Sequence, residues 1–201
     1  MAVRQVTSRI RWLLPHWEEP GSTYFGTFRL ADSLPSEILR QPEFERRDIV
    51  STAKHRQLSV YERSRLTELF NEKVQSQLDA GAGACFLTNP KVAELIMQSL
   101  RNFDGSRYRL YAWCVMPNHV HVVFRPQGTH TLAEILHTWK SYSAKEANRT
   151  LGRSGTFWQR EYYDHLIRGE KEFFQIVNYV LENPRVAGLR DWKWVGAMQR
   201  E

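Results

Sequence analysis

Alternating apolar and polar positions predict β-strands in several parts of the chain. Residues 23–31 alternate aromatic with small side chains, and residues 107–115 and 119–126 alternate and are rich in β-forming residues. Residues 155–168 are typical of a turn followed by a strand. Residues 1–22 follow no regular pattern, so we expect that segment to be irregular.

Apolar residues three or four positions apart predict helices between these strands. Gly152 is expected to end one helix as a left-handed cap, and Pro184 is expected to stop the last one. The predicted helical segments are residues 33–40, the charged residues 41–82 with Gly81 and Gly83 at their end, residues 91–103, residues 131–151 and residues 171–184. This order of strands and helices indicates an α+β sandwich with an antiparallel sheet.

The composition is that of an ordinary globular protein with a basic surface. The 201 residues suit one domain, and no run of about 18 apolar residues predicts a transmembrane helix. The basic N-terminus has no long apolar stretch, which argues against a secretory signal. Cys85 and Cys114 lack the spacing of a metal or redox motif and fit a reducing cytoplasm as small buried residues.

The charge balance suggests a class of partner. A net charge of +6 attracts phosphate, a membrane surface or an acidic protein, or it reflects only a solvated surface. The chain also has seven Trp, eight Tyr and ten Phe, and aromatic rings beside cations suit single-stranded nucleic acid, where bases stack and phosphates pair. Most of those rings are nevertheless expected in the core.

The pair His119 and His121 is the strongest local signal of chemistry. Because strand side chains alternate, both imidazoles should project from one face of the strand, about 7 Å apart. The opposite, buried face would then hold Val120, Val122 and Phe124. Two imidazoles on one face can bind a single divalent metal ion. The pair alone also fits two exposed histidines, or two histidines satisfied within the core.

The last predicted helix carries a tyrosine and an asparagine one turn apart. Tyr179 lies off the apolar stripe of this helix, and Asn183 follows at i+4, so the two side chains project to one neighbourhood. Asn183 could offer a metal-ligating oxygen beside the tyrosine hydroxyl. A half-buried amphipathic tyrosine and a capping asparagine before a proline are the alternative interpretation.

The C-terminal half of the chain matches a known pattern in order and spacing. Residues 111–126 read YAWCVMPNHVHVVFRP and residues 173–189 read FFQIVNYVLENPRVAGL, while SGTFWQREYYDHLIR lies between them and DWKWVGA follows. Together they resemble the REP-associated tyrosine transposases, a branch of the single-tyrosine HUH transposases (IS200-like), over about residues 107–197. The resemblance implies a ferredoxin-like (RRM-like) α+β sandwich of the HUH endonuclease type, with the histidine pair on its central strand.

The resemblance also implies a role for each matching residue. His119 and His121 would bind a Mg²⁺ or Mn²⁺ ion, Asn183 would supply a third, amide ligand, and Tyr179 would be the nucleophile. A phenol is a poor nucleophile at neutral pH, and a metal ion on the scissile phosphate would withdraw charge and orient it for attack. The products would be a 5′-phosphotyrosine and a free 3′-OH, which retains the bond energy for rejoining or strand transfer.

Other residues are candidates for DNA contact. Trp158 and Gln159 could stack or pair with a base, although core packing is the ordinary role of such a tryptophan. Tyr162 and Tyr163 could contact a nucleotide, and they are the alternative nucleophiles. His165 could hydrogen-bond to DNA or to a neighbouring carboxylate, or be structural.

The helix predicted from residue 131 onwards also carries cations. Lys140, Lys145 and Arg149 offer a row of positive charges for phosphate, or merely a solvated face. Residues 39–88 are longer than the resemblance predicts, and we expect a helical elaboration of a single domain, residues 1–201.

The expected function is metal-dependent, site-specific cleavage and strand transfer of single-stranded DNA that carries hairpins of palindromic repeats. The alternatives are a hairpin-DNA-binding module without productive transposition, and a metal-dependent hydrolase with water as its nucleophile. We expect the protein to act in the cytoplasm, associated with the nucleoid and without a membrane, as a monomer or homodimer.

Overall fold

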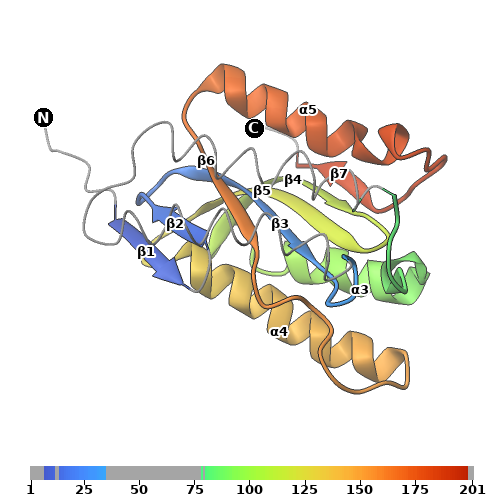
Figure 1. Ribbon diagram of the computed structural model, residues 1–201. Helices are drawn as coiled ribbons and strands as arrows, with labels where there is room; N and C mark the ends of the chain where they lie inside the picture. The colour runs from blue at the N-terminus through green and yellow to red at the C-terminus, as the bar shows by residue number, and fades with distance from the viewer. Residues whose placement is uncertain (1–6, 12–13, 35–77, 79, 199–201) are drawn as a thin grey trace, which may run out of the picture.

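A five-stranded antiparallel sheet forms the centre of the computed structural model, which describes residues 7–11, 14–34, 78 and 80–198 (Figure 1). In spatial order its strands are β6 (Tyr163–Ile167), β3 (Thr23–Arg29), β5 (His119–Pro126), β4 (Tyr108–Val115) and β7 (Val195–Ala197). The chain order β3–α3–β4–β5–α4–β6 is the split β-α-β of the ferredoxin-like fold. The predicted α+β class and the central position of the histidine strand are confirmed.

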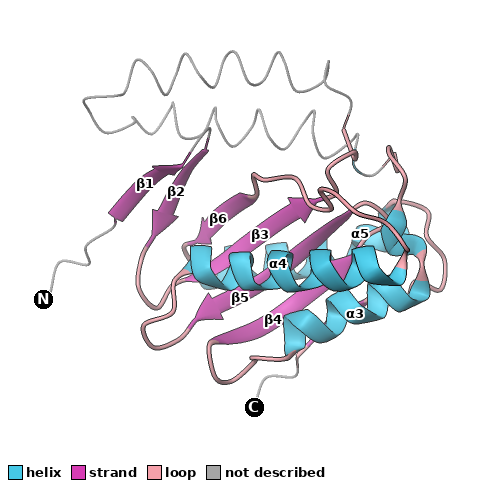
Figure 2. Ribbon diagram, turned by 90° about the horizontal axis from the view of Figure 1, so that it is seen from below, coloured by secondary structure: helices cyan, strands magenta, loops and turns pink. Residues whose placement is uncertain are grey.

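Helices cover both faces of this sheet. Helices α3 (Pro90–Arg101) and α4 (Leu132–Thr150) lie side by side on one face, and α5 (Glu170–Val186) lies on the other (Figures 1 and 2). The short 3₁₀ helix η1 (Phe86–Thr88) leads into α3. Helix α4 begins with a capping box, in which Thr131 and Glu134 each accept a hydrogen bond from the other's backbone N–H.

The two faces of β5 separate the core from the candidate site. As predicted, Val120, Val122 and Phe124 pack in the larger core beneath α3 and α4. Val123 belongs to a smaller apolar cluster beneath α5, which also contains Val180 of that helix. Because α5 covers this face too, the histidines that alternate with the valines are buried rather than exposed.

The last helix does not stop at Pro184 as predicted. Helix α5 continues to Val186 with the proline inside its last turn. Gly188, two residues after the end of the helix, has a φ of +76°. Its N–H donates to Arg185 O, and Leu189 N–H donates to Pro184 O. This is a Schellman ending, which needs the left-handed backbone that glycine adopts readily. The proline removes one helical hydrogen bond near the end and leaves the later carbonyls satisfied.

The N-terminal segment is also more regular than predicted. Strands β1 (Thr7–Arg11) and β2 (Leu14–Glu18) form an antiparallel pair, separate from the main sheet. Pro15 interrupts the strand pattern in the sequence, but proline is tolerated in an edge strand, where no neighbour needs its N–H. Strand β7 was likewise not predicted as a strand, because its short sequence Val-Gly-Ala has no alternation.

Most of the helical elaboration predicted at residues 39–88 lies outside the described residues. The described part of that segment contains a turn at Gly81, whose N–H donates to Leu78 O, and then η1. Cys114 is buried as predicted, whereas Cys85 is only partly buried, and both are free thiols. Among the described helices, none has the length and apolar character needed to cross a lipid bilayer.

Candidate active site

The two histidines of β5 meet at their outer ring nitrogens. His119 and His121 are both fully buried, and their Nε2 atoms are 3.0 Å apart. Their ring centroids are separated by 4.6 Å, which is closer than the strand spacing alone predicts, because the two rings tilt toward each other. The prediction that both imidazoles share one face of the strand is confirmed.

The inner nitrogens of the same rings are held by neighbouring side chains. His119 Nδ1 lies 2.7 Å from Asn118 Oδ1, and the Asn118 amide Nδ2 donates to Ala82 O. Since the amide oxygen can only accept, His119 Nδ1 carries the proton and its Nε2 presents a lone pair. His121 Nδ1 lies 2.8 Å from the hydroxyl of Thr27, its cross-strand neighbour on β3. Such partners fix the tautomer and orientation of histidines that bind metals.

Both imidazoles are held in their neutral form. Burial lowers the pKa of His121 to about 3. Burial also lowers the pKa of His119 well below its ordinary value, and the adjacent His121 ring lowers it further. A neutral imidazole is the form that binds a metal ion, so no proton would have to be displaced at neutral pH.

Helix α5 brings the tyrosine and the asparagine to this face. The Tyr179 ring lies edge-on to His121, with centroids 5.4 Å apart, and edge-on to Phe25 at 5.9 Å. The tyrosine remains 39% exposed, so a substrate can reach it. One turn later Asn183 is only 4% exposed, and its Oδ1 is buried without a hydrogen-bond partner among the described residues.

These residues fit a divalent metal ion. Two nitrogen ligands that bind one metal ion at about 2.1 Å and at a right angle to each other lie about 3 Å apart. The two Nε2 atoms have this separation, 3.0 Å. The unpartnered Oδ1 of Asn183 is a hard oxygen donor of the kind that Mg²⁺ and Mn²⁺ accept. No three His, Cys, Asp or Glu side chains of the described residues gather into a metal-binding group. An ion bound here would therefore depend on the histidine pair and on amide, phosphate or water oxygens.

Comparison with known families identifies the scaffold. Residues 87–183 match the family described as transposase IS200-like. The match covers 97 of the 201 residues, just under half of the chain, and this segment is similar to the IS200-like transposases. Within the IS200-like match lie both histidines, Tyr179 and, as its last residue, Asn183.

Individual relatives share part of the chain. A Haemophilus influenzae protein provisionally named a REP-associated tyrosine transposase is 25% identical over 101 residues, or 43% of this chain and 57% of that protein. An uncharacterised protein of the same organism is 30% identical over 98 residues, or 38% of this chain and 54% of that protein. The chain thus matches little more than half the length of these curated relatives. A solved REP-associated tyrosine transposase bound to a REP hairpin aligns with 94% of this chain and 81% of its own, at 16% identity and a TM-score of 0.49.

Strand β6 and the segment before it contain several of the residues that the sequence predicts to contact DNA. Trp158 is buried in the main core, where its ring packs edge-on against Phe28 and its Nε1 donates to Ser143 Oγ. Its ring therefore has no free face for a base in this arrangement. Gln159 is half-buried, and its backbone N–H donates to Arg29 O.

The remaining residues of this group, Tyr162, Tyr163 and His165, divide between the two faces of the sheet. Tyr163 is buried beneath α5, edge-on to Phe25 at 6.2 Å, whereas Tyr162 packs against the core on the other face. His165 pairs with Glu172 of α5 at 2.8 Å, not with the adjacent aspartate. The structure therefore brings Tyr179, rather than Tyr162, to the histidine pair.

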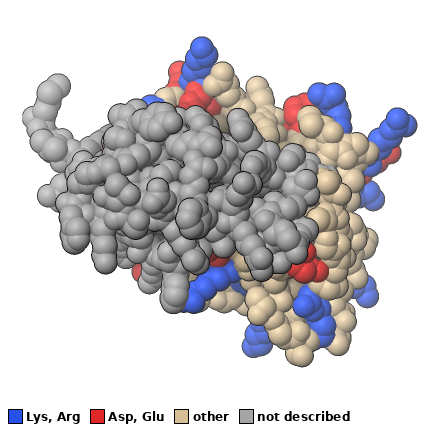
Figure 3. Space-filling view, viewed as in Figure 1, with Lys and Arg blue, Asp and Glu red and all other residues tan. Residues whose placement is uncertain are grey.

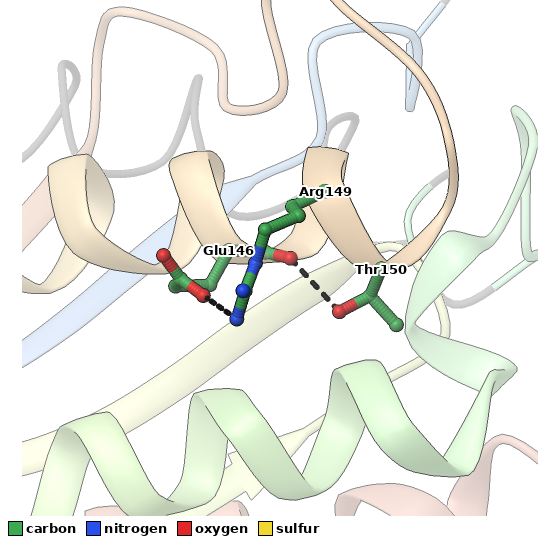
Figure 4. Close-up of polar contacts among 3 residues, drawn as sticks. All are labelled: Glu146, Arg149 and Thr150. Carbon is green, nitrogen blue, oxygen red and sulfur yellow. Dashed lines mark hydrogen bonds and ion pairs between the residues drawn. The ribbon is translucent and has the colours of Figure 1, made fainter.

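The predicted row of cations on α4 is not a single row. Lys140 is half-buried, and its ammonium donates to the carbonyls of Gln159 and Arg160, which fastens that segment to α4. Lys145 is exposed, and Arg149 is exposed and paired with Glu146, whose carbonyl also accepts from Thr150 (Figure 4). Spacings of five and nine residues turn Lys145 and Arg149 away from Lys140.

Sequence reasoning missed the residues that surround the histidines. Thr27 and Asn118 hold the two rings, and the buried Arg29 lies opposite His119 in the register of β3 and β5, with its Nη1 donating to Ser33 Oγ. Asn118 directly precedes His119, and this adjacency was the available signal. Thr27 and Arg29 lie on a distant strand, and only the register between β3 and β5 identifies them.

Proposed function

We propose that this protein cleaves and rejoins single-stranded DNA through a covalent bond between Tyr179 and a 5′-phosphate. The observation that supports this best is the position of an exposed tyrosine edge-on to a buried, neutral histidine whose Nε2 faces that of a second histidine. The match of residues 87–183 to the IS200-like family agrees with DNA as the substrate. DNA hairpins are the proposed form of that substrate, by analogy with the relatives named for such repeats.

The proposed roles follow from the chemistry of each side chain. His119, His121 and Asn183 would hold a Mg²⁺ or Mn²⁺ ion, which when bound supplies Lewis-acid polarisation of the scissile phosphate. Thr27 and Asn118 keep the two imidazoles oriented, with their Nε2 atoms toward each other.

The reaction at Tyr179 balances without an external energy source. Its Oη attacks the phosphorus and releases its proton to solvent, a P–O bond to tyrosine forms, and the P–O bond to the 3′ oxygen breaks to leave a 3′-OH. Attack of a 3′-OH on the phosphotyrosine reverses these steps, and a different 3′-OH gives strand transfer. Water as the nucleophile would give no covalent adduct.

The decisive experiment uses end-labelled single strands that form hairpins, taken from the DNA on either side of the gene, with Mg²⁺ or Mn²⁺. We expect a cleaved strand and a protein–DNA adduct on a denaturing gel, both lost with a chelator. Tyr179→Phe should lose the adduct, because only the attacking hydroxyl is removed. Tyr162→Phe and Tyr163→Phe are the matched controls and should retain it. An adduct in Tyr179→Phe, or DNA linked to either control tyrosine, would overturn the assignment.

The metal site and the alternatives are tested in the same assay. His119→Ala and His121→Ala should lose cleavage while keeping most DNA affinity, because phosphate contacts dominate binding. Binding without cleavage in the unaltered protein would favour the hairpin-binding module, and cleavage without an adduct would favour the hydrolase. Mixing His121→Ala with Tyr179→Phe should restore cleavage only if the two centres are completed between two chains, which separates a dimer from a monomer.

A further inference from the structure

A second hollow lies on the opposite face of the sheet from the histidine pair. It has a volume of about 450 Å³ and is bounded by the C-terminal half of α3, the turn before β4 and the middle of α4. The residues that matter for its chemistry are Asn102, Phe103, Arg107, Trp139 and Tyr142. This volume is within the range of sites that hold small organic groups.

The inner wall of this pocket is fixed by a buried polar network. Trp139 Nε1 donates to the Tyr108 hydroxyl at 2.9 Å, and that hydroxyl donates to Leu100 O at 2.8 Å. The two rings meet edge-on, with centroids 4.9 Å apart. These contacts join α4, β4 and α3, so the cavity is formed before any ligand arrives.

The pocket is positively charged and contains no acid. The Arg107 guanidinium stacks 3.7 Å from the centre of the Phe103 ring, so its plane is held in place. It makes no ion pair with any described residue, and no carboxylate lines the pocket. The carboxylate of Glu134, in the small adjoining cavity, already accepts from Thr131 N–H in the capping box of α4. The Arg107 guanidinium is therefore available to an anion that enters the pocket.

The outer rim offers an aromatic face and an amide. Tyr142 is 52% exposed, one of the most exposed large hydrophobic side chains in the described part of the chain. Asn102 is exposed, and its side chain makes no hydrogen bond with the described residues, so both its donor and its acceptor are available. An aromatic ring, an amide and a cation around one hollow are what a nucleotide requires: a stacking surface, a base-edge partner and a phosphate partner.

We propose that this pocket binds one unpaired nucleotide of the DNA substrate, with the base against Tyr142 and its phosphate at Arg107. The proposal rests on the proposed function only in taking the ligand to be DNA. Because the pocket and the histidine pair lie on opposite faces of the sheet, the bound strand must pass around an edge of the sheet. The pocket then contributes to affinity and to the choice of site, while the histidine face carries out the reaction.

The test measures binding and contact separately from cleavage. Fluorescence anisotropy of labelled single strands should show about tenfold weaker binding for Tyr142→Ala, and a similar loss for Arg107→Gln. Tyr142→Phe keeps the ring and should bind as the unaltered protein does. Lys91→Gln removes one exposed cation from the other end of α3 and should have a much smaller effect than Arg107→Gln.

Photocrosslinking locates the contact directly. Strands with 5-iododeoxyuridine at an unpaired position should crosslink to Tyr142 or Phe103, identified by mass spectrometry of the peptide. Tyr179→Phe should give the same crosslink although it forms no adduct, so the two proposals can fail independently. Equal loss of affinity in Arg107→Gln and Lys91→Gln would mean a net charge effect only, and would overturn the pocket. Unchanged affinity in Tyr142→Ala with an unchanged melting temperature would overturn it as well.

Discussion

At the scale of single residues, the site buries one polar atom, Asn183 Oδ1, that the described residues leave unsatisfied. Asn183 Oδ1 has no hydrogen-bond donor among the described residues, and the two histidines turn their Nε2 atoms toward each other rather than toward water. A buried acceptor without a donor costs about 1–3 kcal/mol. Such a cost makes sense where a ligand supplies the missing interaction, and it can be measured.

Replacement of Asn183 by leucine should therefore separate stability from metal binding. Asn183→Leu, of similar size, should raise the free energy of unfolding of the metal-free protein by about 1 kcal/mol, because no unsatisfied oxygen remains. It should also remove most of the stabilisation that added Mn²⁺ gives. Urea denaturation with a chelator and with Mn²⁺ measures both effects. Asn178→Leu, at an exposed position of α5, is the control and should change neither. A less stable Asn183→Leu that keeps the full Mn²⁺ effect would contradict the assignment.

Burial of the histidines should make the stability of the metal-free protein depend on pH. The folded pKa of His121 is about 3, far below the ordinary value of about 6.5. Below pH 6.5 the unfolded chain therefore binds a proton at this histidine that the folded chain does not bind. The free energy of unfolding consequently falls as pH falls toward 3. One such group contributes up to about 1.4 kcal/mol per pH unit. In urea titrations between pH 7 and pH 4.5, His121→Gln should show a shallower slope, and an identical slope would contradict this.

At the scale of elements, α5 is the part whose placement determines the site. The helix begins at Glu170, and Glu172 in its first turn accepts from Arg168 N–H at 2.7 Å and pairs with His165 of β6. Burial acts to raise the pKa of Glu172, but the bonds from Arg168 and His165 outweigh it and lower that pKa. This carboxylate joins the start of α5 to the edge strand of the sheet. Its negative charge also interacts favourably with the positive N-terminal end of the helix dipole.

Loss of that carboxylate should loosen the start of the helix. Glu172→Ala should lower the free energy of unfolding by about 1 kcal/mol near neutral pH, as the loss of a helix cap does. Because the folded pKa lies below the unfolded one, the difference from the unaltered protein should shrink as pH falls through about 4. Glu170→Ala, two residues earlier in the same turn and exposed, should cost less. Thermal melts at pH 7 and pH 3.5 provide the measurement, and equal effects of the two substitutions would argue against the Glu172 contacts.

At the scale of the whole molecule, charge and access bear on the form of the proposed DNA substrate. The net charge is +6, and in the view of Figure 3 lysine and arginine side chains are spread along the margins with carboxylates among them, rather than gathered in one patch. The candidate site is approached through a half-exposed tyrosine above two buried histidines. In the proposed reaction a strand must therefore present a phosphate at the surface next to Tyr179, and a flexible single strand does so more easily than a duplex.

Cleavage should accordingly require single-stranded DNA and low salt. We expect cutting of single strands and of hairpin flanks, but not of a perfect duplex of the same sequence, in which the bases remain stacked. Affinity should fall steeply between about 50 and 200 mM salt, because binding releases counterions from the phosphates. Gel assays on matched strands and anisotropy titrations at several salt concentrations test both points. Equal cutting of duplex and single strand would contradict the proposed substrate.

Local patterns in the sequence were sufficient for the main strands and helices and for the two histidines, but not for β1, β2 and β7. Strand β5 begins and ends where its alternation predicts, and the same alternation places His119 and His121 on one face. The capping residue Thr131 and the turn signals around α4 are local as well. Side-chain direction along a strand and the start of a helix depend on residues a few positions apart, so the sequence carries that information directly.

Contacts between distant segments decided the rest. The register of β3 against β5 selected Thr27 as the partner of His121, and the crossing of α5 over the sheet brought Tyr179 to that ring. Trp158 is buried because it packs against α4, where Ser143 accepts from its Nε1. Lys140 of α4 donates to a backbone carbonyl of the same segment. Each of these depends on packing between elements far apart in the chain, and no local propensity specifies it. The sequence thus determined which side chains could form a metal and nucleophile site, and the tertiary structure determined which of them meet.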